Sequence, residues 1–228
     1  MNKILINIVV AFSLSAGSAS VWSNASMGGI NSLGVYDISI DTSTLNGISA
    51  GLSFDFLANS PGFADFVRIS NFETDGAFDF LSFDTFGDVS VNPGSNATLG
   101  SSVDFSQFFQ PLVLGDFVNF RLDFRNDPDA VLPGSTDFQN IFTVTLTDET
   151  GEDSLVQTDD SEGTDALLQA DFSITLPQTA ALSLFNASGL TITATPVAAV
   201  PLPAALPLMG FAISILAGLQ KRRKLLMV

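Results

Sequence analysis

The chain has 228 residues, among them eight Lys and Arg, 24 Asp and Glu, and neither His nor Cys. Without Cys and His it can form no disulfide, no thiolate or imidazole zinc site, no Ser-His-Asp triad and no Cys-His pair. Its formal net charge of −16 also argues against nucleic acid as a partner, because phosphate binding needs clustered cations.

The first 25 residues have the layout of a secretory signal peptide, with Lys3 followed by a mostly apolar run from 4 to 16. Small residues predict cleavage after Ala25, and Ala19 offers an alternative bond. An uncleaved anchor or a buried strand is less favoured, because the run is short for a bilayer. We therefore expect export through the Sec machinery.

Residues 26–195 are expected to form the exported domain, in which apolar and polar residues alternate with a period of two. Such alternation is typical of half-buried antiparallel strands. The predicted strands are 36–40, 48–56, 66–72, 78–83, 118–124, 142–146, 170–176, 180–184 and 190–194. Turn signals lie at 44–47, 92–94 and 132–134. This pattern predicts an all-β fold, an antiparallel β-sandwich of the jelly-roll or immunoglobulin-like kind.

Phenylalanine is the main expected core residue, since 19 of the 21 Phe lie in this domain. Phe has no polar tip that would favour an exposed position. Each fully buried Phe stabilises the folded state by about 1.5–3 kcal/mol. A two-layer core can therefore form without disulfides.

Two acidic segments are candidates for binding calcium, a hard cation that prefers six to eight oxygen ligands. Neither follows the EF-hand spacing, and the alternative is a solvated, partly disordered loop. The candidate ligands are Asp127 and Asp129 in the first segment and Asp148, Asp153, Asp159 and Asp160 in the second. Calcium is the one cofactor that the sequence suggests.

An enzyme is not expected. A glycosidase needs only two carboxylates, but pairs of acids arise by chance at this density. Aromatic residues for stacking on a sugar are scarce, because Tyr36 is the sole Tyr and Trp22 lies in the expected signal peptide.

Residues 196–228 are expected to form a linker, a membrane-spanning helix and a basic tail. The 20 residues from Val200 to Leu219 carry no charge, and a helix of that length matches the roughly 30 Å hydrocarbon core of a bilayer. Prolines at 201, 203 and 207 fall before or within the first turn of a helix that begins near 204. A buried helix of a soluble protein is the alternative. The basic cluster that follows would stay in the cytoplasm and leave the acidic domain outside; it consists of Lys221, Arg222, Arg223 and Lys224.

The order of pentapeptide, apolar run and basic cluster resembles the VPLPA-CTERM sorting tail. This tail is a variant of the PEP-CTERM tail of exported proteins in Gram-negative bacteria that make extracellular polysaccharide. The resemblance covers about the last 29 residues, and all five motif positions match: Val200, Pro201, Leu202, Pro203 and Ala204. It implies that an exosortase, a membrane enzyme with a cysteine nucleophile, recognises the motif and removes or exchanges the tail.

Together, charge and resemblance predict a non-catalytic surface or extracellular-matrix protein associated with extracellular polysaccharide or biofilm. Its precursor would be anchored in the inner membrane with a periplasmic domain, and the processed protein would reach the cell surface or the medium. Cations would bridge it to anionic polysaccharide. The alternative is a carbohydrate-binding module that uses one face of the sandwich.

Overall fold

The computed structural model of the chain describes residues 31–58, 65–79, 81–93, 95–126, 140–172 and 179–197. The expected signal peptide, the tail from residue 200 and the turn at 132–134 lie outside these residues. The elements in chain order are β1 (Asn31–Asp41), the 3-10 helix η1 (Ser43–Leu45), β2 (Ser49–Leu57), β3 (Asp65–Thr74), β4 (Ala77–Phe78), β5 (Asp84–Phe86), β6 (Val89–Asn92), β7 (Asn96–Gly100), β8 (Phe105–Val113), β9 (Phe117–Asn126), β10 (Asn140–Asp148), β11 (Ala166–Phe172), β12 (Ala180–Leu184) and β13 (Thr191–Pro196).

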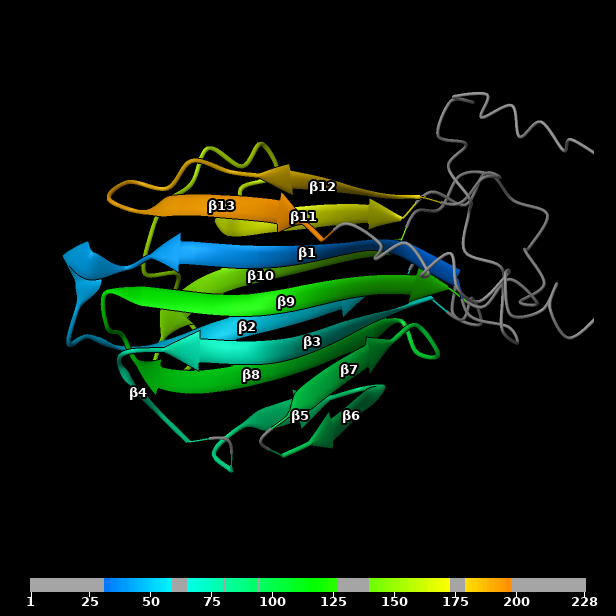
Figure 1. Cartoon of the computed structure of the whole chain (residues 1–228), viewed down its shortest axis with the longest axis horizontal. Helices are drawn as coiled ribbons and strands as arrows, with labels where there is room; N and C mark the ends of the chain where they lie inside the picture. Colours follow the sequence, from blue (N-terminus) through cyan, green and yellow to red (C-terminus); the bar gives the residue numbers. More distant parts are fainter. Residues whose placement is uncertain are drawn as a thin grey trace, which may run out of the picture.

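These strands form two antiparallel sheets that pack face to face (Figure 1). The first sheet has the order β13-β1-β9-β3-β7-β6, and the second has the order β12-β11-β10-β2-β8-β4, with β5 also pairing with β8. The prediction of an all-β, two-sheet antiparallel domain is confirmed. The described residues contain no α-helix, and none of them belongs to a helix able to cross a bilayer.

The first nine strands pair in a nested order. β1 pairs with β9, β2 with β8, and β3 with β7, so the segment from 31 to 126 behaves as one long hairpin that is folded over itself. The three pairs alternate between the two sheets: β1–β9 and β3–β7 belong to the first sheet, and β2–β8 belongs to the second. The later strands β10, β11 and β12 then widen the second sheet beside β2, while β13 returns to the first sheet beside β1.

Most strands expected from alternation are present. No more than one residue of each of the following predicted segments lies outside a strand: 36–40, 48–56, 66–72, 118–124, 142–146, 180–184 and 190–194. Several strands are longer than predicted, and β1 begins five residues earlier, at Asn31. The turn at 44–47 is also confirmed, with Gly47 at a φ of 84°, a conformation that favours glycine. The predicted strand 170–176 overlaps β11, which begins four residues earlier, at Ala166; residues 173–176 lie outside the described part.

The predicted strand 78–83 is wrong. Among the described residues of this segment, only Phe78 belongs to a strand, the short β4 that pairs with β8. Phe83 packs against Phe108 from a loop, so its contact with the core needs no strand. Sequence alternation also missed β5, β6, β7 and β8. In β8 both Phe108 and Phe109 are buried, on opposite faces, so the period of two disappears. Phe109 lies over Gly51, where an added Cβ would stand 2.1 Å from its ring.

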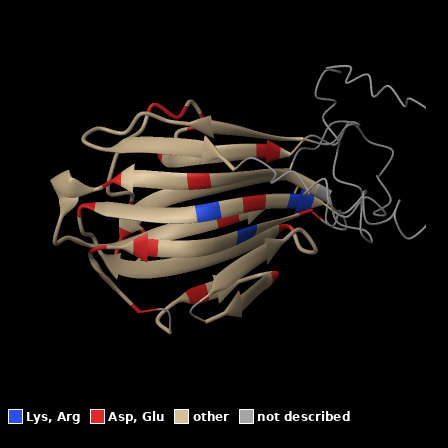
Figure 2. Cartoon of the chain, viewed as in Figure 1, with Lys and Arg blue, Asp and Glu red and all other residues tan. Residues whose placement is uncertain are grey.

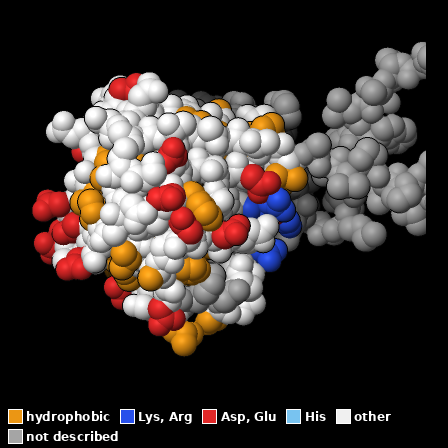
Figure 3. All heavy atoms as spheres, turned by 60° about the vertical axis from the view of Figure 1, so that its left-hand side comes forward, with side chains coloured by type: hydrophobic (Ala, Val, Ile, Leu, Met, Phe, Trp, Pro, Cys, Tyr) orange, Lys and Arg blue, Asp and Glu red, His pale blue; other side chains and the backbone are white. Residues whose placement is uncertain are grey.

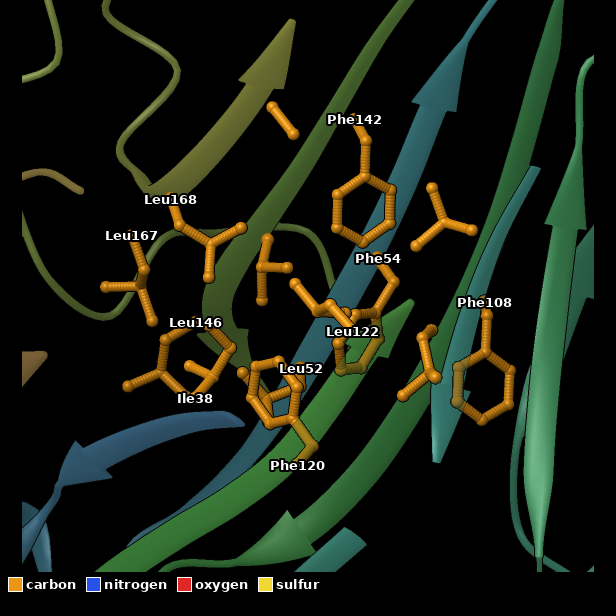
Figure 4. Packing of buried hydrophobic residues seen from close by; sticks show 14 of the residues in the cluster. Ile38, Leu52, Phe54, Phe108, Phe120, Leu122, Phe142, Leu146, Leu167 and Leu168 are labelled. Carbon is orange, nitrogen blue, oxygen red and sulfur yellow. The ribbon is translucent and has the colours of Figure 1, made fainter. Parts of the chain in front are cut away.

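Phenylalanine side chains join the two sheets. Phe54 of β2 lies with its ring centre 5.3 Å from that of Phe120 of β9, in an edge-to-face arrangement, and 6.5 Å from that of Phe142 of β10. Phe124 of β9 similarly contacts Phe142 and Phe172 at 5.9 and 5.6 Å. Figure 4 shows how such rings and the neighbouring Leu side chains fill the space between the sheets. The aromatic pairs add about 0.5–1.5 kcal/mol each beyond their buried area.

Replacing Phe54 by Ala should lower the free energy of unfolding by about 3–5 kcal/mol, because Phe54 is fully buried and its neighbours on both sheets cannot close the cavity. Urea unfolding of the full-length protein in mild detergent, followed by circular dichroism, measures this. The control is Phe86→Ala, at a side chain that is 64 % exposed, with an expected change within about 0.5 kcal/mol. Similar losses in both variants would contradict this account of the core.

Candidate functional site: acidic loops and a groove on the second sheet

The acidic segment between β10 and β11 follows a defined path, unlike the partly disordered loop that was the alternative to a calcium site. The amide of Asp148 donates to the carbonyl of Asp153 at 2.8 Å, and that of Leu155 donates to the carbonyl of Leu146 at 3.0 Å. Val156 is buried against the core, and Asp159 N–H donates to the carbonyl of Asn186. The segment is therefore folded onto the sandwich.

The predicted ligands Asp148 and Asp159 are occupied by local hydrogen bonds. Asp148 accepts the hydroxyl of Thr150 at 2.9 Å and the amide of Glu152 at 3.1 Å. Asp159 accepts both the side-chain amide and the backbone N–H of Asn186 at 2.7 Å. The Thr150 hydroxyl and the Asn186 side chain are the main causes that lower the pKa of Asp148 and Asp159, respectively.

The other two predicted ligands in this segment differ in burial: Asp160 is buried and Asp153 is exposed. Asp160 is 9 % exposed, and its carboxylate accepts the amides of Glu162 and Thr164 at 3.0 and 3.1 Å as well as the Thr164 hydroxyl. Desolvation alone would raise the pKa of Asp160, but these hydrogen bonds outweigh it and lower the pKa. The side chain of Asp153 is exposed. Asp160 thus fixes the turn from 160 to 164.

The structure does not bring the four described candidate calcium ligands together around one point. Asp127 and Asp129 lie outside the described residues. Asn126 and Asn140 lie at the same end of the sandwich, whereas Asp148 ends β10 at the other end, about 26 Å away along the strand. Among the described residues, no three acidic side chains converge closely enough to hold a metal ion.

A buried polar cluster lies between the sheets at the Asn126 end. Asn140 donates its side-chain amide to Asp65 at 2.8 Å, and the amide of Asp65 donates to the hydroxyl of Ser101. Burial raises the pKa of Asp65, and the bond from Asn140 partly offsets this. Asn126 stands directly opposite Asp65, and its side-chain amide is buried without a hydrogen-bond partner in the described part of the chain.

All three cations of the described chain lie on β3 and β9 of the first sheet (Figure 2). Their positions alternate with the buried residues that face the second sheet, so they belong to the outer face. Arg121 forms a bidentate pair with Asp37, with N–O distances of 2.7 and 2.9 Å, and this pair lowers the pKa of Asp37. Arg125 pairs with Asp123, which also lies opposite Arg68 on β3. In Figure 3 the cationic side chains in view lie close together, while acidic side chains are spread widely over the face shown.

The outer face of the second sheet carries a groove that sequence reasoning did not identify. Its floor is a row of polar side chains that stand side by side across four adjacent strands. The row consists of Gln169 on β11, Thr143 on β10, Asp55 on β2 and Gln107 on β8. A second row, two residues along each strand, consists of Asp171, Ile141, Leu57 and Phe105. Glu162 and Thr164, in the turn that Asp160 fixes, line one side.

Hydrogen bonds hold the polar row in place. Gln107 donates its side-chain amide to Asp55 at 2.9 Å, and Ser53 donates its hydroxyl to the same carboxylate at 3.0 Å. Gln169 donates to Asp171 at 3.0 Å. Burial raises the pKa of Asp55, although the bonds from Gln107 and Ser53 oppose the effect. The groove thus has an ordered polar half with carboxylates and an apolar half that includes Leu57, which is 43 % exposed.

The sorting motif Val200–Ala204 and the basic cluster Lys221–Lys224 lie outside the described residues, and they remain predictions. Comparison of the chain with protein-family models, curated proteins and solved structures finds no match. Fold and site therefore define the class by themselves: an acidic, two-layer, all-β protein with a polar-apolar groove on one outer face.

Asp55→Asn tests the electrostatics of the groove. Because the pKa of Asp55 is raised above 3.8 in the folded state, its ionised form costs folding free energy at neutral pH. That cost disappears as the pH falls through the raised pKa. The stability of Asp55→Asn relative to wild type should therefore be more favourable at pH 7 than at pH 4. Asp153→Asn supplies the effect of net charge alone, and a difference for Asp55→Asn that does not vary with pH would contradict the burial argument.

A calcium site on the acidic segments predicts that calcium at about 100 times its Kd raises the Tm of the full-length protein by roughly 5–10 °C. Sodium chloride at equal ionic strength should not, because it only screens charge. Differential scanning calorimetry measures both. Equal shifts for the two salts would reduce the acidic segments to solvated surface.

Proposed function

We propose that the chain is a non-catalytic exported protein of the cell surface or extracellular matrix, sorted by an exosortase through its VPLPA tail. The observation that carries this proposal is the order of motif, uncharged run and basic cluster from Val200 to Lys224. The precursor would enter the Sec pathway, remain anchored in the inner membrane with its domain in the periplasm, and reach the surface after processing.

The C-terminal boundary of the described fold supports this proposal. Val197 N–H donates to the carbonyl of Val35 in β1 at 2.8 Å, so the chain is attached to the first sheet three residues before the motif begins. Three residues span at most about 11 Å. A processing enzyme at the membrane surface would therefore meet the motif close to the folded domain.

For the fold, we propose the jelly-roll rather than the immunoglobulin-like alternative. In a jelly roll a long antiparallel hairpin wraps into two sheets, so that its first and last strands pair and the inner strands pair in turn. The pairs β1–β9, β2–β8 and β3–β7 follow this nested order. The strands from β10 to β13 would be additions to the two sheets.

Carbohydrate binding is the second candidate function, and the groove on the second sheet favours it. Sugar rings combine hydroxyl groups with apolar faces, and the groove places an amide and carboxylate row beside an apolar row. The protein could instead bind anionic polysaccharide through bridging cations, and this mode of binding depends on calcium binding by the acidic segments.

Mass spectrometry of the protein from its own host tests the sorting proposal. The mature surface protein should lack the tail, whereas the double variant Pro201→Ala, Pro203→Ala should accumulate in the inner membrane with residues through Val228 intact. Pro207→Ala is a matched control, because it removes a proline of the same region outside the pentapeptide. An intact tail in the mature surface protein of the wild type would contradict processing.

A further inference from the structure

We propose that the groove on the second sheet binds a polysaccharide strand that carries free amino groups, such as a polymer of glucosamine. This inference rests on the proposed role among extracellular polysaccharides and specifies the chemistry of the ligand. The polar row consists of Gln169, Thr143, Asp55 and Gln107, and the second row, called the apolar row, consists of Ile141, Leu57 and Phe105 with the carboxylate of Asp171 at its end.

The direction of the groove fits a polysaccharide. Both rows cross the strands, so adjacent members are separated by the spacing between strands, about 4.8 Å. This spacing is comparable to the length of one sugar ring in an extended chain, and a row of four strands offers one position for each ring. The side-chain amides and hydroxyl along the polar row can bond sugar hydroxyls without rearrangement of the backbone.

The apolar row supplies the second requirement, a surface for the ring faces. Phe105 is half-buried beside Leu57, its cross-strand neighbour, and its ring centre lies 6.0 Å from that of the exposed Phe86. The one Tyr and the one Trp of the sequence are not among the residues that line the groove, but these Phe and Leu side chains provide apolar surface beside the polar row. Sugar faces that cover Leu57 would remove apolar surface from water.

Charge selects the kind of polysaccharide. Asp55, Asp171 and Glu162 line the groove, and none of its lining residues is basic. The three described arginines lie on the outer face of the other sheet, and the whole chain carries a net charge of −16. A polyuronate would meet repulsion here, whereas an ammonium group can pair with a carboxylate that amides already hold in position.

The spacing of the carboxylates fits repeated amines. Asp55 and Asp171 are two strands apart and two residues apart along the strands, which places their Cα atoms about 12 Å from each other. This separation is comparable to two consecutive rings of an extended hexosamine chain. Two ammonium groups on one strand of polymer could therefore pair with both carboxylates while the ring between them lies over Thr143 and Ile141.

Calorimetric titration of the full-length protein in mild detergent tests the inference with four hexamers: glucosamine, N-acetylglucosamine, glucose and glucuronate, all β-1,4-linked. The glucosamine hexamer should bind at least about tenfold more tightly than the other three, because only it adds charge-assisted hydrogen bonds to ring stacking. Equal binding of the amino and N-acetyl forms, preference for the uronate, or no binding of any hexamer would overturn the inference. None of these results bears on processing of the tail, so the sorting proposal stands or falls separately.

Matched variants locate the binding. Asp55→Asn and Asp171→Asn should each weaken binding of the glucosamine hexamer by about tenfold, whereas Glu73→Gln removes the same charge from an exposed position on the first sheet and should change it by less than about twofold. Leu57→Ala should weaken binding, and Ile48→Ala, at a side chain of similar exposure outside the groove, should not. Circular dichroism confirms that each variant is folded. Equal losses for Asp55→Asn and Glu73→Gln would show attraction by net charge alone and would overturn the site.

Discussion

The contact between the phenylalanine side chains of β9 and those of β2, β10 and β11 is the interaction on which the described structure depends. In the described part of the chain, the largest cluster of buried apolar side chains is the layer between the two sheets, and both sheets contribute to it. The chain has no Cys to link the sheets, and mutual repulsion among its carboxylates opposes compaction. Aromatic packing must therefore supply the cohesion that disulfides provide in many other exported domains.

Because the main core lies between the sheets, the side chains on the two outer faces can differ in charge and polarity. The first sheet gathers the three arginines, two of them paired with Asp37 and Asp123, and the second presents the groove around Asp55. The acidic segment between β10 and β11 contributes to the groove, because Asp160 accepts hydrogen bonds that fix the turn on one side of it. The rigid sheets thus position residues from four strands that are far apart in the sequence.

Alternation was sufficient to predict the strands that bury one face, such as β1, β9 and β10, and the fold class with them. It failed where both faces are covered, as at Phe108 and Phe109 of β8, and where a loop buries an aromatic ring, as at Phe83. The groove could not be predicted, because Asp55 and Gln169 become neighbours of Thr143 only through register between strands. The acidic segments were recognised by composition, but only topology shows that Asn126 and Asp148 lie at opposite ends.

The central claim is that one aromatic layer makes the two sheets a single cooperative unit. Amide hydrogen exchange of the full-length protein, resolved by mass spectrometry, tests it directly. Buried amides of β9 in the first sheet and of β2 and β10 in the second should exchange with the same free energy of opening, equal to that of global unfolding. Exchange of β9 at a clearly lower free energy than β2 and β10 would mean that the sheets open independently, and would contradict the account.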